Sequence, residues 1–117
     1  VRVLVHNGFE VQLPAGQGCC GSLNLHAGER ATGVEMASHN AAVLLSGDPD
    51  FVVTASAGCG STMKEYEEML PQHPQAALLA EKTRDIHELL VEFGFEPPTG
   101  SLDAKVVFQD PCHLLST

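Results

Sequence analysis

The chain has 117 residues, enough for one domain with its own core, and a hydrophobic content of 44% excludes a disordered polymer. Six basic against fifteen acidic residues leave a net charge of -9, which repels nucleic acid and anionic membranes, so we expect neither as a partner. The longest apolar runs, residues 41–45 and 76–80, are too short to span a bilayer, and we expect no signal peptide at the N-terminus. These features predict a soluble cytoplasmic domain with no direct membrane insertion.

The first half of the chain predicts two helices and two strands. Apolar residues at helical spacing, followed by Asn-Gly, predict a short helix over residues 1–7. A strand is predicted over 9–13, and after a glycine-rich loop the apolar period predicts an amphipathic helix over 29–45. A continuous apolar and β-branched run over 51–55 is typical of a strand covered on both faces. This strand is predicted to be the most buried element.

The second half predicts further helices and a third strand. A capping-box pattern between Thr62 and Glu65 predicts a short helix, and a longer helix is predicted over residues 74–94. A proline-rich connector then leads into a strand over 105–109. Because no linker divides the chain, we expect a single domain over 1–117. Its ends carry neither an initiator Met nor a closing signal, so we expect a piece of a longer protein.

The alternation of helices and strands predicts an α/β fold, namely a three-layer, Rossmann-like domain with a small, mostly parallel sheet and helices on both faces. Each cysteine follows a predicted strand: Cys19 and Cys20 the first, Cys59 the second and Cys112 the third. The carboxyl ends of parallel strands share one edge, where open α/β folds bind ligands, so we expect the thiols to gather there. Helix N-termini at that edge would favour the thiolate, the form that ligates metals.

The spacing of the cysteines favours iron over zinc. Cys19 and Cys20 are adjacent, so a disulfide between them would be strained, and they do not readily span two corners of one small zinc tetrahedron. Neighbouring thiolates can instead bind separate iron atoms of a cluster. Glycines beside the cysteines let the backbone approach such a cluster and offer amide N–H groups to it. These candidate cofactor-binding glycines are Gly18, Gly21, Gly58 and Gly60.

Two other features of the sequence leave alternatives open. Gly16, Gly18 and Gly21 match the dinucleotide-binding fingerprint, but the helix and the acidic residue that should follow are missing, so a chance match is favoured. His26 and His113 lie near cysteines, where metal ligation or proton transfer competes with structural hydrogen bonding. A dinucleotide-binding domain and histidines that serve the metal centre therefore both remain alternatives.

Five motifs occur together and in the same order as in a known family. They are residues 18–21 (GCCG), 25–29 (LHAGE), 57–60 (AGCG) with 64–66 (KEY), 84–90 (RDIHELL) and 110–114 (DPCHL). With them the chain resembles the cysteine-rich CCG domains of heterodisulfide reductase, of lactate-utilisation and anaerobic glycerol-3-phosphate dehydrogenase iron–sulfur subunits, and especially of glycolate oxidase iron–sulfur subunits. The resemblance covers nearly the whole chain.

The resemblance implies an iron–sulfur centre, expected to be of the 4Fe-4S type, with Cys19, Cys20, Cys59 and Cys112 as ligands. Members of the family carry two CCG repeats, so Cys112 would open the second repeat of a longer chain. Thr62 stands where the closing C-x-x-C of the family has its second cysteine, which leaves the set incomplete. The detached domain is expected to be inactive, with or without bound metal.

The resemblance also implies a function. The domain would pass electrons from a flavin-binding partner subunit, which oxidises a 2-hydroxy acid such as glycolate, toward membrane quinones. The expected location is the cytoplasm, peripheral to the inner membrane through the complex. A thiol–disulfide redox domain of the heterodisulfide reductase type is the alternative that uses the same cysteines.

Overall fold

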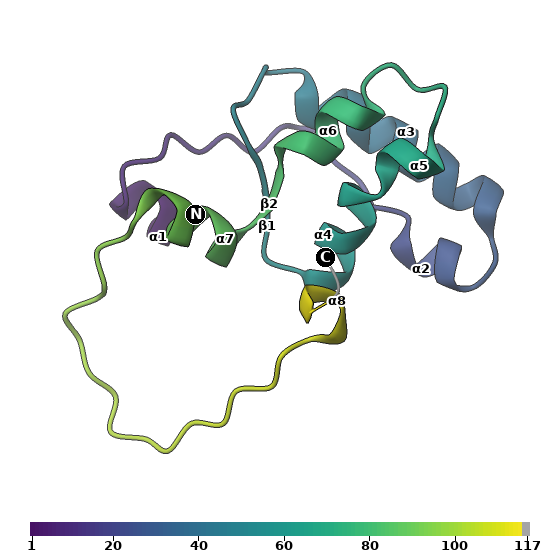
Figure 1. Cartoon of the computed structure of the whole chain (residues 1–117). Helices are drawn as coiled ribbons and strands as arrows, with labels where there is room; N and C mark the ends of the chain where they lie inside the picture. The colour runs from purple at the N-terminus through teal and green to yellow at the C-terminus, as the bar shows by residue number, and fades with distance from the viewer. Residues whose placement is uncertain (116–117) are drawn as a thin grey trace.

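The computed structural model describes residues 1–115. Along this range the elements are α1 (Arg2–His6), α2 (Ser22–His26), α3 (Arg30–Leu45), β1 (Val52–Thr54), α4 (Ala57–Lys64), α5 (Tyr66–Met69), α6 (Ala76–Lys82), β2 (Thr83–Asp85), α7 (Ile86–Phe93) and α8 (Cys112–Leu115). Figure 1 shows helices packed around two short strands, and a wide arc of chain between α7 and α8 that leaves this body. In the described part of the chain, no helix has the length and apolar character needed to cross a membrane.

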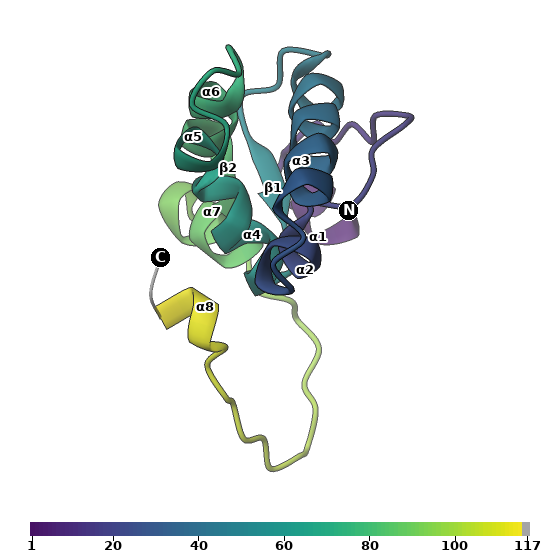
Figure 2. The ribbon, with the colours of Figure 1, turned by 90° about the vertical axis from the view of Figure 1, so that its right-hand side faces the viewer.

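The two strands form a parallel pair inside the body. The register joins Val52 to Thr83, Val53 to Arg84 and Thr54 to Asp85. α4 and α7 pack against both strands, and α3 packs against α6. In Figure 2, α3 lies on one side of the strands and α5 and α6 on the other. The predicted α/β class with a parallel sheet is confirmed, while the Rossmann-like layering stays a prediction.

The core lies between α3 and the helices α4 to α6. Its buried members are Cys20, Ala37, Ala41, Leu45, Val52, Met63, Tyr66, Leu70, Ala76 and Leu79. Tyr66 and Leu79 are among the largest fully buried side chains, and removing such apolar surface from water is the main favourable term in folding. Because Cys20 belongs to this core, one of the candidate ligands is part of the hydrophobic interior.

The helix predicted over residues 29–45 is confirmed as α3. Its buried residues recur at helical spacing and are Gly33, Ala37, Asn40, Ala41 and Leu45. Gly28, with a φ of +83°, separates α3 from α2 through a left-handed turn that other residues adopt only with strain. The short helix predicted over residues 1–7 is confirmed as α1.

The single helix predicted over residues 74–94 is wrong, because β2 interrupts it. Thr83 is fully buried, and its hydroxyl donates to the Leu79 carbonyl at 2.7 Å in the last turn of α6. The chain then extends and pairs with β1 before it turns into α7. Pairing with a buried strand overrides the local helix pattern, since propensity is a weak prior against tertiary contacts.

The capping box lies at Asp85 rather than at Thr62. The Asp85 carboxylate accepts a hydrogen bond from the His87 N–H, and the Glu88 carboxylate accepts one from the Asp85 N–H, each at 2.8 Å. These bonds satisfy N–H groups at the start of α7. α4 instead begins two residues before Cys59, so this cysteine lies within the helix and not ahead of it.

The strands predicted over residues 9–13 and 105–109 do not form. In the first segment Phe9 packs edge-on against Phe93, with 5.8 Å between ring centroids, but no backbone hydrogen bond joins the segment to β1. In the second, Val107 is 94% exposed, and the chain between α7 and α8 contains no helix or strand. A strand needs a neighbour that takes its N–H and C=O groups, and within residues 1–115 neither segment has one.

Candidate metal centre

Two cysteines meet at the edge of the core. Cys20 is 6% exposed and precedes α2, while Cys59 lies on α4 and is half-buried against the core. The Cys20 thiol donates to the Cys59 sulfur, with 3.1 Å between the two Sγ atoms. The fold therefore brings together two thiols that are 39 residues apart in the sequence.

Cys59 follows a strand along the chain, whereas the other cysteines do not. β1 ends at Thr54, and the chain then turns into α4, which carries Cys59. Cys19 and Cys20 follow an irregular segment held on α3, and Cys112 begins α8 after the irregular arc. The prediction that every cysteine follows a strand is therefore wrong for these three, because the segments before them have no strand to pair with.

Asn40 of α3 holds the loop that carries Cys19. Its side chain is 3% exposed, and the amide oxygen accepts from the Gly18 N–H at 2.7 Å. The amide nitrogen donates to the carbonyls of Gly18 at 2.9 Å and Cys19 at 2.8 Å, so one side chain satisfies three backbone groups. These bonds occupy the Gly18 N–H, and no strand precedes the loop, which argues against the dinucleotide-binding alternative.

Two buried hydroxyl groups fix the segment around Cys20. The Tyr66 hydroxyl, from α5, donates to the Cys20 carbonyl at 2.7 Å, and the Tyr66 side chain is fully buried. The Thr62 hydroxyl, on α4, donates to the Ser22 hydroxyl oxygen at 2.9 Å, and both residues are buried. The chain at Cys20 is thus tied to the two helices next to it in the core.

Close packing of the backbone explains one of the predicted glycines, Gly21. It adopts a φ of +83°, and a β carbon there would lie 2.6 Å from the Gly33 carbonyl oxygen. A β carbon on Gly33 would in turn lie 2.7 Å from the Leu25 Cγ. α2 and α3 therefore meet through these glycines, and a side chain on either would force them apart.

The remaining predicted glycines differ in their surroundings. A β carbon on Gly60 would lie 2.9 Å from the Thr54 methyl group, so Gly60 lets α4 pack closely on β1. At Gly18 the nearest such contact is 3.7 Å, and at Gly58 no atom lies within 4 Å. The space beside Gly18 and Gly58 leaves their role toward a cofactor a prediction.

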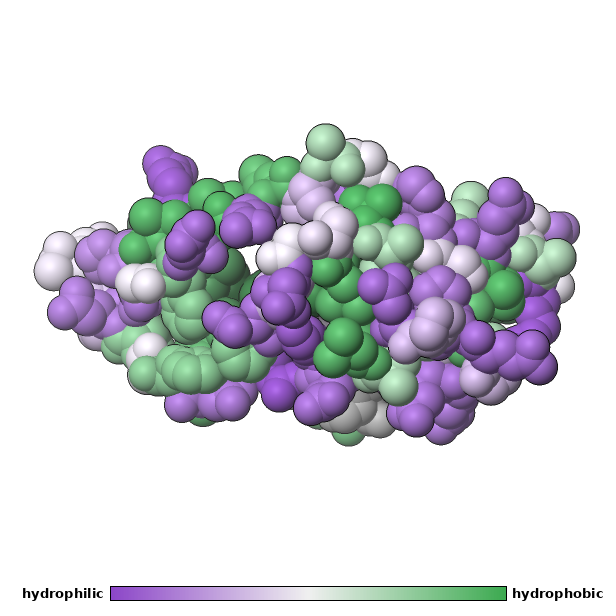
Figure 3. Space-filling model, turned by 90° about the horizontal axis from the view of Figure 1, so that it is seen from above, coloured by the Kyte–Doolittle hydropathy of each residue, from purple (hydrophilic) through white to green (hydrophobic). Residues whose placement is uncertain are grey.

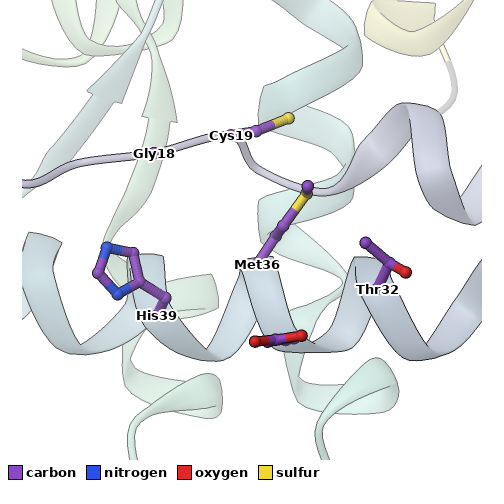
Figure 4. Close-up of a pocket in the computed structure, with 6 residues that line it drawn as sticks. Gly18, Cys19, Thr32, Met36 and His39 are labelled. Carbon is purple, nitrogen blue, oxygen red and sulfur yellow. The ribbon is translucent and has the colours of Figure 1, made fainter.

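Cys19 faces solvent at a surface hollow of about 370 Å³. The Cys19 sulfur accepts a long hydrogen bond, 3.4 Å, from the Gly21 N–H. In Figure 4 the Met36 side chain rises from α3 toward the segment that carries Cys19, and the His39 ring lies near Gly18. The hollow is lined by Gly18, Cys19, Thr32, Glu35, Met36 and His39. Cys19 is therefore the thiol on the solvent side of the site.

The last described helix, α8, returns the chain to this region. It packs against α4, and the His113 ring lies 5.5 Å from the His26 ring between centroids, tilted by 57°. Cys112 thus lies on a helix that contacts the helix bearing Cys59. Within residues 1–115, no group of three or more His, Cys, Asp or Glu side chains is arranged to hold a metal ion. Ligation by all four cysteines stays a prediction.

Burial changes the pKa of two groups at the site. It raises the pKa of the Cys20 thiol to about 11, and the neighbouring Cys59 and Cys19 sulfurs add to the rise. Burial also raises the pKa of the Tyr66 hydroxyl, and the adjacent Cys20 acts in the same direction. Cys20 is therefore a neutral thiol at neutral pH, contrary to the expectation that helix N-termini favour its thiolate. A metal that binds here must displace this proton.

Sequence reasoning missed the residues that hold the cysteines in place. Asn40 gave a signal, because it is a polar residue on the apolar face of the predicted helix over 29–45. The hydroxyl of Tyr66 bonds to a carbonyl 46 residues away, and this partner has no signature in the sequence. The Ser22–Thr62 pair is equally remote along the chain.

Comparison with known families bears on the identity of this site. Residues 1–64, which include three of the four cysteines, match the family described as a CCG cysteine-rich domain. The chain belongs to the CCG cysteine-rich domain family. The family resemblance seen in the five motifs is thus confirmed.

Relatives of this CCG domain include subunits of oxidoreductases. It is similar to the probable glycolate oxidase iron-sulfur subunit of Bacillus subtilis, at 36% identity over 97% of this chain and 27% of the relative. The glycolate oxidase iron-sulfur subunit of Escherichia coli is 34% identical over 97% and 30%. A fumarate reductase (CoM/CoB) subunit of Methanothermobacter marburgensis is 32% identical over 98% and 22%. The chain thus spans less than a third of the length of these relatives. No solved structure matches it.

Proposed function

We propose that this CCG domain holds an iron–sulfur cluster and belongs to an electron-transfer subunit of an oxidoreductase that acts on a 2-hydroxy acid. The contact between Cys20 and Cys59 carries the proposal, because it joins two of the family motifs in space. Relatives named as iron-sulfur subunits of glycolate oxidase support the same function.

The thiols fit an iron–sulfur group in their chemistry. Cysteine thiolates are the usual ligands of such clusters, and Cys20 and Cys59 offer two sulfurs at one point, with Cys19 on the solvent side. The fit requires one adjustment. In a cluster of the 4Fe-4S type each thiolate binds a different iron atom, so the two sulfurs at 3.1 Å must move well apart when the cluster binds.

Cys19, Cys20, Cys59 and Cys112 are the ligands that we propose, for a cluster of the 4Fe-4S type. When bound, the cluster would supply one-electron redox chemistry. The exposed Cys19 marks the side from which electrons would enter or leave, since the sulfur of Cys20 is buried.

The chain's own residues orient the proposed ligands. Asn40 fixes the backbone at Cys19, and Tyr66 fixes the carbonyl of Cys20, so neither ligand depends on the cluster for its position. The rings of His26 and His113 contact each other at a tilt, and we propose that these residues border the cluster rather than bind it. Gly18 and Gly58 leave the backbone free to approach it.

The remaining parts of the proposal concern the longer protein. The relatives are three to five times as long as this chain, as their covered shares of 30% to 22% imply, and a second CCG repeat would lie in the additional length. Partner subunits that bind flavin would oxidise the 2-hydroxy acid and deliver electrons to this domain. The complex would work in the cytoplasm, at the inner membrane, where quinones accept the electrons.

The test uses the full-length subunit, purified without oxygen and reconstituted with ferrous iron and sulfide. We expect a visible sulfide-to-iron charge-transfer absorption that dithionite bleaches and that a quinone analogue restores. A protein without this absorption, or with an absorption that dithionite leaves unchanged, contradicts the proposal.

A further inference from the structure

The separation of the Cys20 and Cys59 sulfurs is closer to that of a disulfide than to that of thiolates bound to different iron atoms of a cluster. Their separation of 3.1 Å lies about 1 Å beyond a disulfide bond. Two thiolates on one tetrahedral metal lie about 3.8 Å apart, and thiolates on different iron atoms of a cluster lie farther apart still. We propose that, in the protein without its cluster, these two cysteines form a reversible thiol–disulfide site that reacts with low-molecular-weight disulfides. The consequence for cluster loading, described below, rests on the proposed function.

The backbone on each side of the pair is already fixed. The Tyr66 hydroxyl holds the Cys20 carbonyl, the Thr62 hydroxyl holds Ser22, and Cys59 is part of α4. Bond formation therefore needs only a small rotation of two side chains. Cys19 does not compete for Cys20, because adjacent cysteines close a strained ring and the Cys19 sulfur is turned to the Gly21 N–H.

The reaction proceeds by two exchanges with an external disulfide such as oxidised glutathione. The more exposed Cys59 attacks first, which breaks the external S–S bond, releases one thiol and leaves a mixed disulfide on Cys59. Cys20, whose sulfur lies 3.1 Å from that of Cys59, then attacks the Cys59 sulfur and releases the second thiol. Two electrons pass from the cysteine pair to the external disulfide, and the two protons leave on the released thiols.

The disulfide would block metal binding at the empty site. Both sulfurs are consumed in the bond, so neither can ligate iron until a dithiol reduces it. Meanwhile the link joins the loop before α2 to α4 and preserves the arrangement in which the ligands lie together.

The experiment treats the full chain, freed of metal and reduced, with oxidised glutathione under argon. Trypsin would place Cys20 on residues 3–30 and Cys59 on residues 31–64, so we expect these peptides to be linked. Because Cys19 shares the first peptide, Cys19→Ser is the matched control and should keep the link. Cys20→Ser and Cys59→Ser should lose it. In the wild-type chain, thiol titration should fall from four groups to two.

A link that disappears in Cys19→Ser, or peptides that carry only glutathione, overturns the proposal.

Iron uptake distinguishes a failure of the thiol–disulfide site from a failure of the proposed function. We expect the oxidised chain to take up iron and sulfide at least tenfold less than the reduced chain, with recovery after dithiothreitol. If the linked chain takes up as much iron as the reduced chain, the disulfide does not block metal binding and this part of the proposal is wrong. A chain that forms the link, together with a reduced full-length subunit that takes up no iron, contradicts the proposed function and leaves the thiol–disulfide site standing.

Discussion

Gly21 and Gly28 share a backbone conformation and differ in their surroundings. Both have a φ of +83°, but a β carbon on Gly21 would lie 2.6 Å from the Gly33 carbonyl oxygen, while at Gly28 no atom lies within 4 Å. Gly28→Ala should therefore lower the free energy of unfolding by about 1–2 kcal/mol, the cost of the left-handed conformation alone. Gly21→Ala should cost at least about 3 kcal/mol, because overpacking adds to that strain.

Urea denaturation of the two glycine variants measures this difference. Since the conformational cost is common to both, the excess in Gly21→Ala reports the contact between α2 and α3. Equal losses in the two variants would contradict the close approach at Gly21.

Tyr66 contributes to the site through its hydroxyl as well as through its buried ring. Tyr66→Phe keeps the ring and leaves the Cys20 carbonyl without its partner, so we expect the free energy of unfolding to fall by about 1–3 kcal/mol. Ser46→Ala is the matched control, because the Ser46 hydroxyl donates to the Val43 carbonyl at 2.8 Å but is exposed. The control should lose less than about 0.5 kcal/mol. Chemical denaturation checks both values, and a loss in Tyr66→Phe no larger than in the control would contradict the role of this bond.

At the scale of elements, Glu88 joins the start of α7 to α4. Its carboxylate accepts from the Lys64 ammonium at 2.7 Å and from the Asp85 N–H at 2.8 Å. Burial acts to raise the pKa of Glu88, but the Lys64 ammonium and the Asp85 N–H together hold it below its ordinary value of 4.5. The stabilisation is therefore fully present above pH 4.5 and is lost as the pH falls through the lower pKa of the folded state.

Glu88→Gln should flatten this pH dependence. The free energy of unfolding of the wild type should decrease as the pH falls below 4.5, and the variant should show a smaller decrease. At neutral pH the variant should lose at most about 1 kcal/mol, because the Lys64–Glu88 pair is partly exposed and screened by solvent. Glu67→Gln, a change at an exposed carboxylate on α5, serves as the control. If the two variants have the same pH profile, the account of Glu88 is wrong.

The elements show which parts of the fold the sequence predicts. α3 was predictable because its buried face follows the helical period over 16 residues without a proline. β2 was not, because the three residues from Thr83 to Asp85 carry no strand pattern of their own and extend only to pair with β1. The strand predicted over residues 105–109 does not form, for the opposite reason. Its sequence pattern is strong, but within the described chain no other strand pairs with it.

At the scale of the whole molecule, apolar side chains are exposed on the arc between α7 and α8. Leu102, Val106, Val107 and Phe108 are each at least 75% exposed. The view from above in Figure 3 shows hydrophobic patches between hydrophilic residues, as expected of an acidic chain with a mixed surface. The arc makes few contacts with the body, so its backbone is open to proteases.

Limited trypsin digestion should therefore cut first after Lys105. Lys64, Lys82 and Arg84 lie in helices or strands and form ion pairs, which protects the adjacent peptide bonds. Mass spectrometry of the earliest fragments checks the order, with Lys105→Gln as the control that should delay cleavage. A first cut after Lys64 or Lys82 would contradict the exposed arc.

The cysteines of the candidate site could be identified from the sequence, but the contacts that hold them in place could not. Adjacent cysteines among glycines indicated a cluster from the sequence, and the contact between Cys20 and Cys59 agrees with the expectation that distant thiols converge. The bonds from Asn40 and Tyr66 that produce this convergence join residues 21 and 46 positions apart, and such tertiary bonds have no local pattern. The sequence therefore indicated the candidate ligands, whereas the residues that position them could be identified only from the structure.

The central claim is that Cys20 and Cys59 act together as ligands of one iron–sulfur cluster. The most direct measurement is the iron and acid-labile sulfide content of the full-length subunit, reconstituted without oxygen, in the wild type and in Cys20→Ser, Cys59→Ser and the double variant. We expect each single variant to lose most of the iron and sulfide of this cluster and the double variant to lose no more than either, because both thiols serve the same group. Iron and sulfide contents in the double variant equal to those of the wild type would contradict the account.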